Sequence, residues 1–165
     1  MSGPQIAIDM THQPERLVVE GVRRMMAGYD TADAGCWELA WQFYKAELGG
    51  ERARKPSSEL VHYARALNAH GIRRLCLFPY NCRKLCQDEC LVASLIAAAQ
   101  SDDDAALTAI GSALVSETGL GETLFSAREF GSALKDSGLV LETITLSDLP
   151  LDDCPLKQFA SRIRH

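Results

Sequence analysis

The sequence lacks the features that mark a membrane-spanning or secreted chain. Its longest apolar stretch, Leu91 to Ala99, is interrupted by Ser94 and falls far short of the roughly 18–20 residues that a membrane span needs. The segment Met1 to Thr11 has neither the basic region nor the apolar run of a secretory signal. Six cysteines in 165 residues are also too few for a disulfide scaffold. These absences predict a soluble, cytoplasmic protein that does not associate with membranes.

The motifs of several common enzyme and nucleic-acid-binding classes are missing as well. There is no G-x-S-x-G and no P-loop, and Gly119-Leu120-Gly121 lacks the third glycine and the preceding strand of a dinucleotide fingerprint. No helix-turn-helix signature is present, and the aromatic residues do not alternate with basic ones as a stacking surface requires. The sequence therefore assigns no catalytic residue, favours a protein that is not an enzyme, and does not predict a nucleic-acid partner.

What is present is helical periodicity in a chain of ordinary globular composition, with 47% apolar and 24% charged residues. We expect a single domain over residues 1–165, with 1–13 and 147–165 as peripheral arms. The spacing of apolar residues predicts a mainly α fold, a bundle of about six helices. The expected helices cover 14–27, 33–48, 57–69 and 82–100, a segment that begins at Ser101, a segment that ends near Ser137-Gly138, and a short final stretch at 155–163.

Two short segments have the pattern of β-strands. Residues 72–78 are β-compatible and end at Pro79, and residues 139–146 alternate between apolar and polar side chains. Because an isolated strand leaves its backbone groups without partners, we expect these two segments to pair as a minor two-stranded element.

The net charge of −5 conceals an uneven distribution. Residues 51–84 carry 8 basic and 2 acidic side chains, whereas residues 85–154 carry 2 basic and 13 acidic ones. Such asymmetry is typical of complementary solvated faces, and it also fits a site for an anion or an acidic partner. The candidate anion-binding residues are Arg73, Arg74, Arg83 and Lys84.

The same region contains a cysteine cluster formed by Cys76, Cys82, Cys86 and Cys90. Three interpretations stay open. The cysteines pack as small apolar residues in the core. Alternatively, they bind zinc or an iron–sulfur cluster, with His62 or His70 available to complete the set. In the third, Cys82 alone is a redox-reactive thiol, because it would follow an Asn81 N-cap at the positive end of a helix.

Two functional hypotheses follow, of different classes. In the first, this is a small helical binding or regulatory protein of unknown specific role, which acts through protein–protein or anionic-ligand contacts. A homodimer is expected, with the alanine-rich hairpin 91–115 as a close-packing surface. In the alternative, it is a metal-binding or thiol-based redox protein that uses Cys76, Cys82, Cys86 and Cys90.

Overall fold

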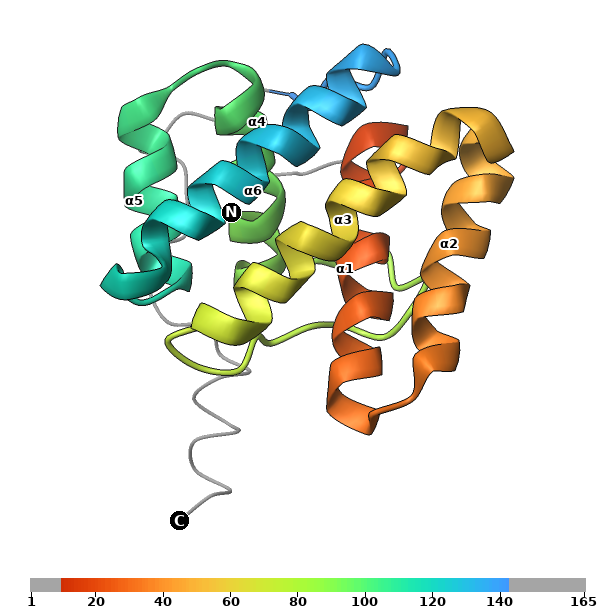
Figure 1. Cartoon of the computed structure of the whole chain (residues 1–165), viewed down its shortest axis with the longest axis horizontal. Coiled ribbons are helices and arrows are strands. Elements are labelled where there is room, and N and C mark those ends of the chain that lie inside the picture. Colours follow the sequence, from red (N-terminus) through yellow and green to blue (C-terminus); the bar gives the residue numbers. More distant parts are fainter. Residues whose placement is uncertain (1–9, 143–165) are drawn as a thin grey trace, which may run out of the picture.

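Six helices make up the part of the chain that the structure describes, residues 10–142 of a computed structural model (Figure 1). They are α1 (Gln13–Thr31), α2 (Ala34–Leu48), α3 (Gly50–His70), α4 (Gln87–Gln100), α5 (Asp104–Leu114) and α6 (Glu117–Asp136). The prediction of a mainly α bundle is confirmed. None of the described helices combines the length and the apolar character needed to cross a membrane. Residues 1–9 of the expected arm 1–13, the expected arm 147–165 and the short helix at 155–163 lie outside the described residues; of the rest of the first arm, Gln13 already belongs to α1.

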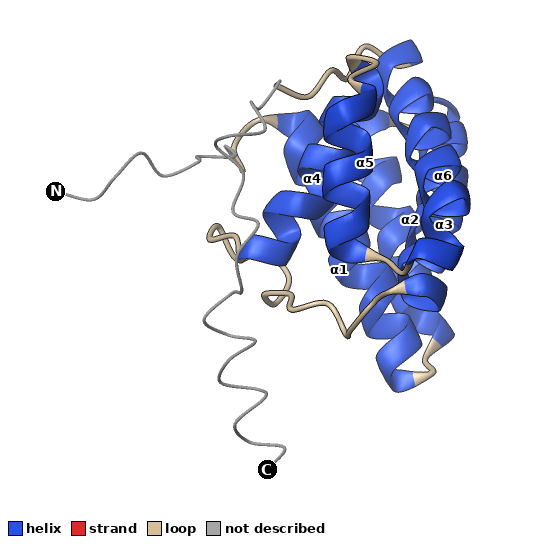
Figure 2. Cartoon of the chain, turned by 90° about the vertical axis from the view of Figure 1, so that its left-hand side faces the viewer, coloured by secondary structure: helices blue, strands red, loops and turns tan. Residues whose placement is uncertain are grey.

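Helix α4 forms the centre of the bundle. Every residue from Asp88 to Gln100 is buried, and the helix packs against α1, α5 and α6. Figure 2 shows α3 and α6 on one side of the bundle and most of the irregular segment 71–86, which leads into α4, on the other. The alanine-rich surface of α4 is therefore internal and is not available for contact with a second copy.

Helices α1 and α2 are joined by a tight turn. We expected α1 to end at Gly28, but it continues to Thr31 and is capped by Ala32 in the left-handed conformation. The physical role of Gly28 is close packing, since a Cβ atom there would lie 2.4 Å from Nε1 of Trp37. Helix α2 starts one residue later than predicted, because Asp33 is its N-cap and the Asp33 side chain accepts a hydrogen bond from the Gly35 amide at 2.9 Å.

Helix α3 begins earlier than the sequence suggested. Pro56 predicted a start at Ser57, but the helix begins at Gly50, directly after the positive-φ residue Gly49, and Pro56 lies inside it. Both Ala53 and Pro56 are buried. Burial of these two side chains offsets the backbone hydrogen bond that proline cannot make.

Helix α4, in contrast, begins later than predicted. Asn81 is not its N-cap, because Asn81 has a left-handed φ of 64° and its amide donates to the Glu20 carboxylate. The N-cap is Cys86, and the helix starts at Gln87. The following turn is shifted in the same way: Ser101 ends α4, and the side chain of Asp103 caps α5 by accepting from the Ala106 amide at 3.1 Å.

The expected two-stranded element does not form in the described residues. Residues 72–78 are irregular, and residues 139–142 lie in no strand; residues 143–146 are outside the described part. The physical reason is that side chains take the place of a partner strand. Gln100 donates to the Leu139 carbonyl at 2.9 Å and accepts from the Leu141 amide at 2.8 Å. Only an isolated bridge between Gly71 and Val115 is β-like within residues 10–142.

Candidate functional site

The residues that the sequence singled out lie in and beside the segment 71–86, which connects α3 to α4 and contains no helix or strand. An irregular segment must find partners for its backbone groups outside any regular ladder. Here the partners are buried ionic side chains of α1 and α4. The contacts that hold this segment determine which of its side chains face inward and which remain at the surface.

Three buried carboxylates accept hydrogen bonds from the backbone of this segment. Glu20 accepts from the Asn81 amide at 3.0 and 3.1 Å. Glu89 accepts from the amides of Phe78 and Cys86, each at 3.1 Å. Asp88 accepts from the Cys76 amide at 2.8 Å. The exposed fractions of Glu20, Glu89 and Asp88 are 2%, 1% and 0%, so these bonds form away from water.

Arg23 lies between two of these carboxylates. It is 2% exposed, and its Nε and Nη2 atoms contact the Glu89 carboxylate at 2.6 and 3.0 Å. Nη1 forms an ion pair with Glu20. The remaining donors reach the carbonyls of Cys82 at 2.8 Å and Lys84 at 2.9 Å. A guanidinium has five N–H donors, and all of them are used here.

The charge balance at Arg23 follows from these contacts. Burial by itself lowers the pKa of Arg23, but hydrogen bonds and charge from Glu89 and charge from Glu20 outweigh it, so the pKa is raised above its ordinary value. The guanidinium therefore stays charged inside the protein. A buried charge pair of this kind is favourable only when each partner is fully hydrogen-bonded, and this arrangement meets that condition.

Arg24 connects the same segment to α2. Its guanidinium lies over the Phe43 ring at 4.5 Å and over the Tyr80 ring at 4.7 Å, and its Nη1 contacts the Glu20 carboxylate at 2.5 Å. Burial, followed by the influence of the nearby Cys36 side chain, raises the pKa of the Tyr80 phenol. Cation–π contacts thus hold Tyr80 between α1 and α2.

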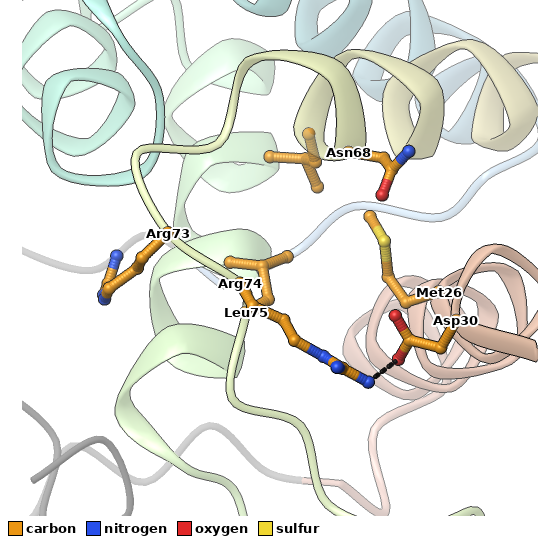
Figure 3. Close-up of a pocket in the computed structure, with 7 residues that line it drawn as sticks. Met26, Asp30, Asn68, Arg73, Arg74 and Leu75 are labelled. Carbon is orange, nitrogen blue, oxygen red and sulfur yellow. Dashed lines mark ion pairs between the residues drawn. The ribbon is translucent and has the colours of Figure 1, made fainter. Parts of the chain in front are cut away.

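The four predicted anion-binding residues fall into two pairs. Arg73 forms an ion pair with Asp88 at 2.7 Å, and Arg74 forms one with Asp30 at 2.8 Å. In Figure 3 the Arg74–Asp30 pair lies beside a small pocket of about 40 Å³. Such a volume is suited to water and is well below the roughly 300 Å³ of a typical ligand site. The residues that line it are Met26, Asp30, Leu67, Asn68, Arg73, Arg74 and Leu75.

Arg83 and Lys84 are different. Both are exposed, and neither side chain forms an ion pair with any residue in the described part of the chain. Their backbone, in contrast, is held in place, because the carbonyls of Cys82 and Lys84 accept from Arg23. The structure therefore presents two cationic side chains on a fixed backbone and neutralises the other two.

The four cysteines of the predicted cluster occupy different environments. Cys90 is buried in the first turn of α4 and packs in the core, while Cys82 and Cys76 are half-buried. Cys82 precedes α4 and does not occupy its first position, so the helix-dipole argument for a reactive Cys82 thiol does not hold. The Cys86 thiol, which is buried, donates to the Cys76 carbonyl at 2.5 Å.

Metal binding finds no support in this geometry. Between residues 10 and 142, no group of three or more histidine, cysteine, aspartate or glutamate side chains is arranged to hold a metal ion. His62 is exposed on α3, and His70 contacts Glu122 of α6 at 2.5 Å.

The sequence did not identify the buried ionic residues. Glu20 and Arg23 are surrounded by apolar residues of α1, and Asp88 and Glu89 directly precede the apolar run of α4. Charged residues embedded in apolar sequence were the available signal. Periodicity alone assigns such residues to a solvated face, and only tertiary contacts identify their partners.

Comparison with known proteins adds no assignment: no family model, no curated protein and no solved structure matches this chain.

Proposed function

We propose that this is a small helical binding protein that recognises an acidic partner through the segment 71–86, with Arg83 and Lys84 as the contact residues. The observation that carries the proposal is the contrast between a fixed backbone and two exposed cationic side chains. Arg23 binds the carbonyls of Cys82 and Lys84, while the Arg83 and Lys84 side chains remain exposed without an ion pair in the described residues. Rigidly held loops on a helical scaffold are a common place for recognition.

Preorganisation is the physical advantage of such an arrangement. Binding through a flexible loop loses the conformational entropy of that loop, at roughly 1–2 kcal/mol for each residue that becomes ordered. Here Glu20, Glu89 and Asp88 already hold the backbone before a ligand arrives. An acidic ligand then has only to immobilise the two long cationic side chains. Less of the electrostatic attraction is offset by lost conformational entropy, and the affinity is higher.

The partner class follows from charge. Arginine and lysine side chains both bind carboxylates, and an acidic peptide segment supplies several at once. Arg83 and Lys84 are both exposed, so the contact is expected to be a surface contact with another protein. Self-association as a homodimer remains a separate prediction, and the buried surface of α4 does not supply its interface.

The test uses a fluorescent poly-glutamate peptide and measures its dissociation constant by anisotropy at low and moderate salt. Removing the two charges in Arg83→Ala/Lys84→Ala should weaken binding about fivefold, since each exposed ion pair contributes about 0.5 kcal/mol. The matched control is Arg54→Ala/Lys55→Ala, which removes another adjacent pair of exposed cations, on α3.

The outcomes are distinct. A weaker affinity in the first variant with little change in the control supports recognition by the segment 71–86. An equal loss of affinity in both variants would show that the peptide is attracted to positive charge anywhere on the protein, and would contradict recognition by the segment 71–86. The absence of measurable binding by the wild-type protein would contradict the proposal outright. A steep dependence on salt is expected in every case where binding is ionic.

A further inference from the structure

We propose that Cys76 and Cys86 form a reversible disulfide, a modification site that joins the two ends of the segment leading from α3 to α4. The starting observation is a direct contact between the two residues. The Sγ atom of Cys86 lies 2.5 Å from the carbonyl oxygen of Cys76 and donates to it. This site differs from the surface of Arg83 and Lys84, and it does not depend on whether those residues bind a partner.

The contact places the sulfur close to the Cys76 side chain. A carbonyl oxygen lies about 2.4 Å from its own Cα, so the Cys86 sulfur is within about 4.9 Å of the Cys76 Cα. In disulfides the two Cα atoms are up to about 6.8 Å apart and the two Cβ atoms about 3.8 Å apart. A cysteine sulfur lies about 2.8 Å from its own Cα, so the two Cα atoms are at most about 7.7 Å apart, which is within about 1 Å of the upper limit for a disulfide.

The backbone around the two cysteines also suits a disulfide. The Cys76 amide is bound by Asp88 at 2.8 Å and the Cys86 amide by Glu89 at 3.1 Å. Asp88 and Glu89 are neighbours in the first turn of α4, so both cysteines are attached to the same turn. Cys86 has extended dihedrals, φ −85° and ψ 171°, and formation of the disulfide does not break a helix.

Cys90 lies four residues after Cys86, inside α4, and offers an alternative pairing that peptide mapping distinguishes from the link to Cys76.

The oxidant that we propose is a hydroperoxide. The half-buried Cys76, as thiolate, attacks one oxygen of hydrogen peroxide; the O–O bond breaks, Cys76 becomes a sulfenic acid, and the departing hydroxide takes up a proton to form water. The Cys86 sulfur then attacks the Cys76 sulfur. The S–O bond breaks, the hydroxyl leaves with the Cys86 proton as a second water, and the S–S bond forms. The two thiols lose two electrons, and one peroxide is reduced to two waters.

The test begins with the full-length protein, purified under reducing conditions and treated with a small excess of hydrogen peroxide. Remaining thiols are blocked with N-ethylmaleimide, and the protein is digested without reduction by trypsin, chymotrypsin and Glu-C. Cleavage after Arg74, Tyr80, Lys84 and Glu89 places each cysteine of the cluster on its own peptide. We expect mass spectrometry to find peptide 75–80 linked to peptide 85–89, and dithiothreitol to remove the link.

Serine variants provide the controls. Cys76→Ser and Cys86→Ser should each abolish the link, whereas Cys90→Ser, in the same turn of α4 as Asp88, should retain it. Cys82→Ser and Cys154→Ser should retain it as well. A link from Cys76 or Cys86 to any other cysteine, or peroxide oxidation without a link, overturns the proposal. The mapping on wild-type protein decides the question even if a variant fails to fold.

Discussion

At the scale of single residues, the structure depends most on Arg23. This side chain binds two carboxylates on different helices and two carbonyls of the segment 71–86, and no other described arginine combines such contacts with full burial. Removing one member of such a network leaves the others charged and buried. A buried charge without a partner is far more costly than a broken surface pair.

Replacing Arg23 with methionine is predicted to destabilise the protein by about 3–5 kcal/mol, because Glu89 loses its buried counter-charge and Glu20 keeps only its ion pair with Arg24. The control is Arg74→Met, which breaks the exposed ion pair with Asp30 and should cost at most about 1 kcal/mol. Urea unfolding followed by circular dichroism gives both free energies. An equal decrease in the free energy of unfolding in the two variants would contradict the conclusion that the structure depends most on Arg23.

At the scale of elements, the packing of α6 against α3 depends on a glycine. A Cβ atom at Gly119 would lie 2.0 Å from Cγ and 2.3 Å from Cβ of His70, so the helices approach too closely there for any side chain. Gly121, two residues further along α6, has no atom within 4 Å of the corresponding position. The sequence presents the two glycines as one motif, but they have unrelated roles.

The pair Gly119→Ala and Gly121→Ala should therefore shift stability in opposite directions. Alanine at 119 forces α6 away from His70 and is expected to cost about 1–3 kcal/mol, as overpacking does. Alanine at 121 meets no obstacle and should stabilise α6 by about 0.5–1 kcal/mol through helix propensity. Thermal unfolding of both variants beside the wild type measures the difference. Stabilisation by both substitutions would contradict the close approach of Gly119 to His70.

At the scale of the whole molecule, two buried tyrosines link the helices through the core. The Tyr44 phenol on α2 donates to the Leu17 carbonyl of α1 at 2.7 Å, and the Tyr63 phenol on α3 donates to the Val92 carbonyl of α4 at 2.8 Å. Burial raises the pKa of both phenols well above the ordinary value of 10.0; a nearby Arg24 charge lowers that of Tyr44 slightly. Both groups therefore stay protonated in the folded state at alkaline pH.

Stability should consequently fall as pH rises above 10. Below that pH the phenols are protonated in both states; above it the unfolded chain releases two protons that the folded protein keeps, so unfolding becomes more favourable. The two phenols together contribute a loss of about 2.7 kcal/mol for each pH unit. Urea unfolding between pH 8 and 11 measures the slope, and Tyr44→Phe/Tyr63→Phe should reduce it. The same slope in the double variant would contradict this origin.

The sequence by itself determined the helical architecture. Apolar periodicity predicted most helices, since an amphipathic stripe must be buried wherever the chain places it. It also located the region that contains Arg83, Lys84 and the cysteines. It erred at Gly28, Pro56 and Asn81, where local rules for ending or starting a helix were overridden by contacts with Trp37, by burial of α3 and by Glu20.

Only the tertiary structure decided which side chains of the segment 71–86 are exposed and which are paired. Which cations are neutralised depends on whether a carboxylate from a distant part of the chain lies within reach, as Asp30 does for Arg74. The contact between Cys86 and Cys76 likewise arises because Asp88 and Glu89 bind the two backbones at one turn of α4. The periodicity of apolar residues predicts which face of a helix is buried. An ion pair or a thiol contact, in contrast, forms only when two separate elements bring their side chains within a short distance of each other. That distance is set by how the whole bundle packs.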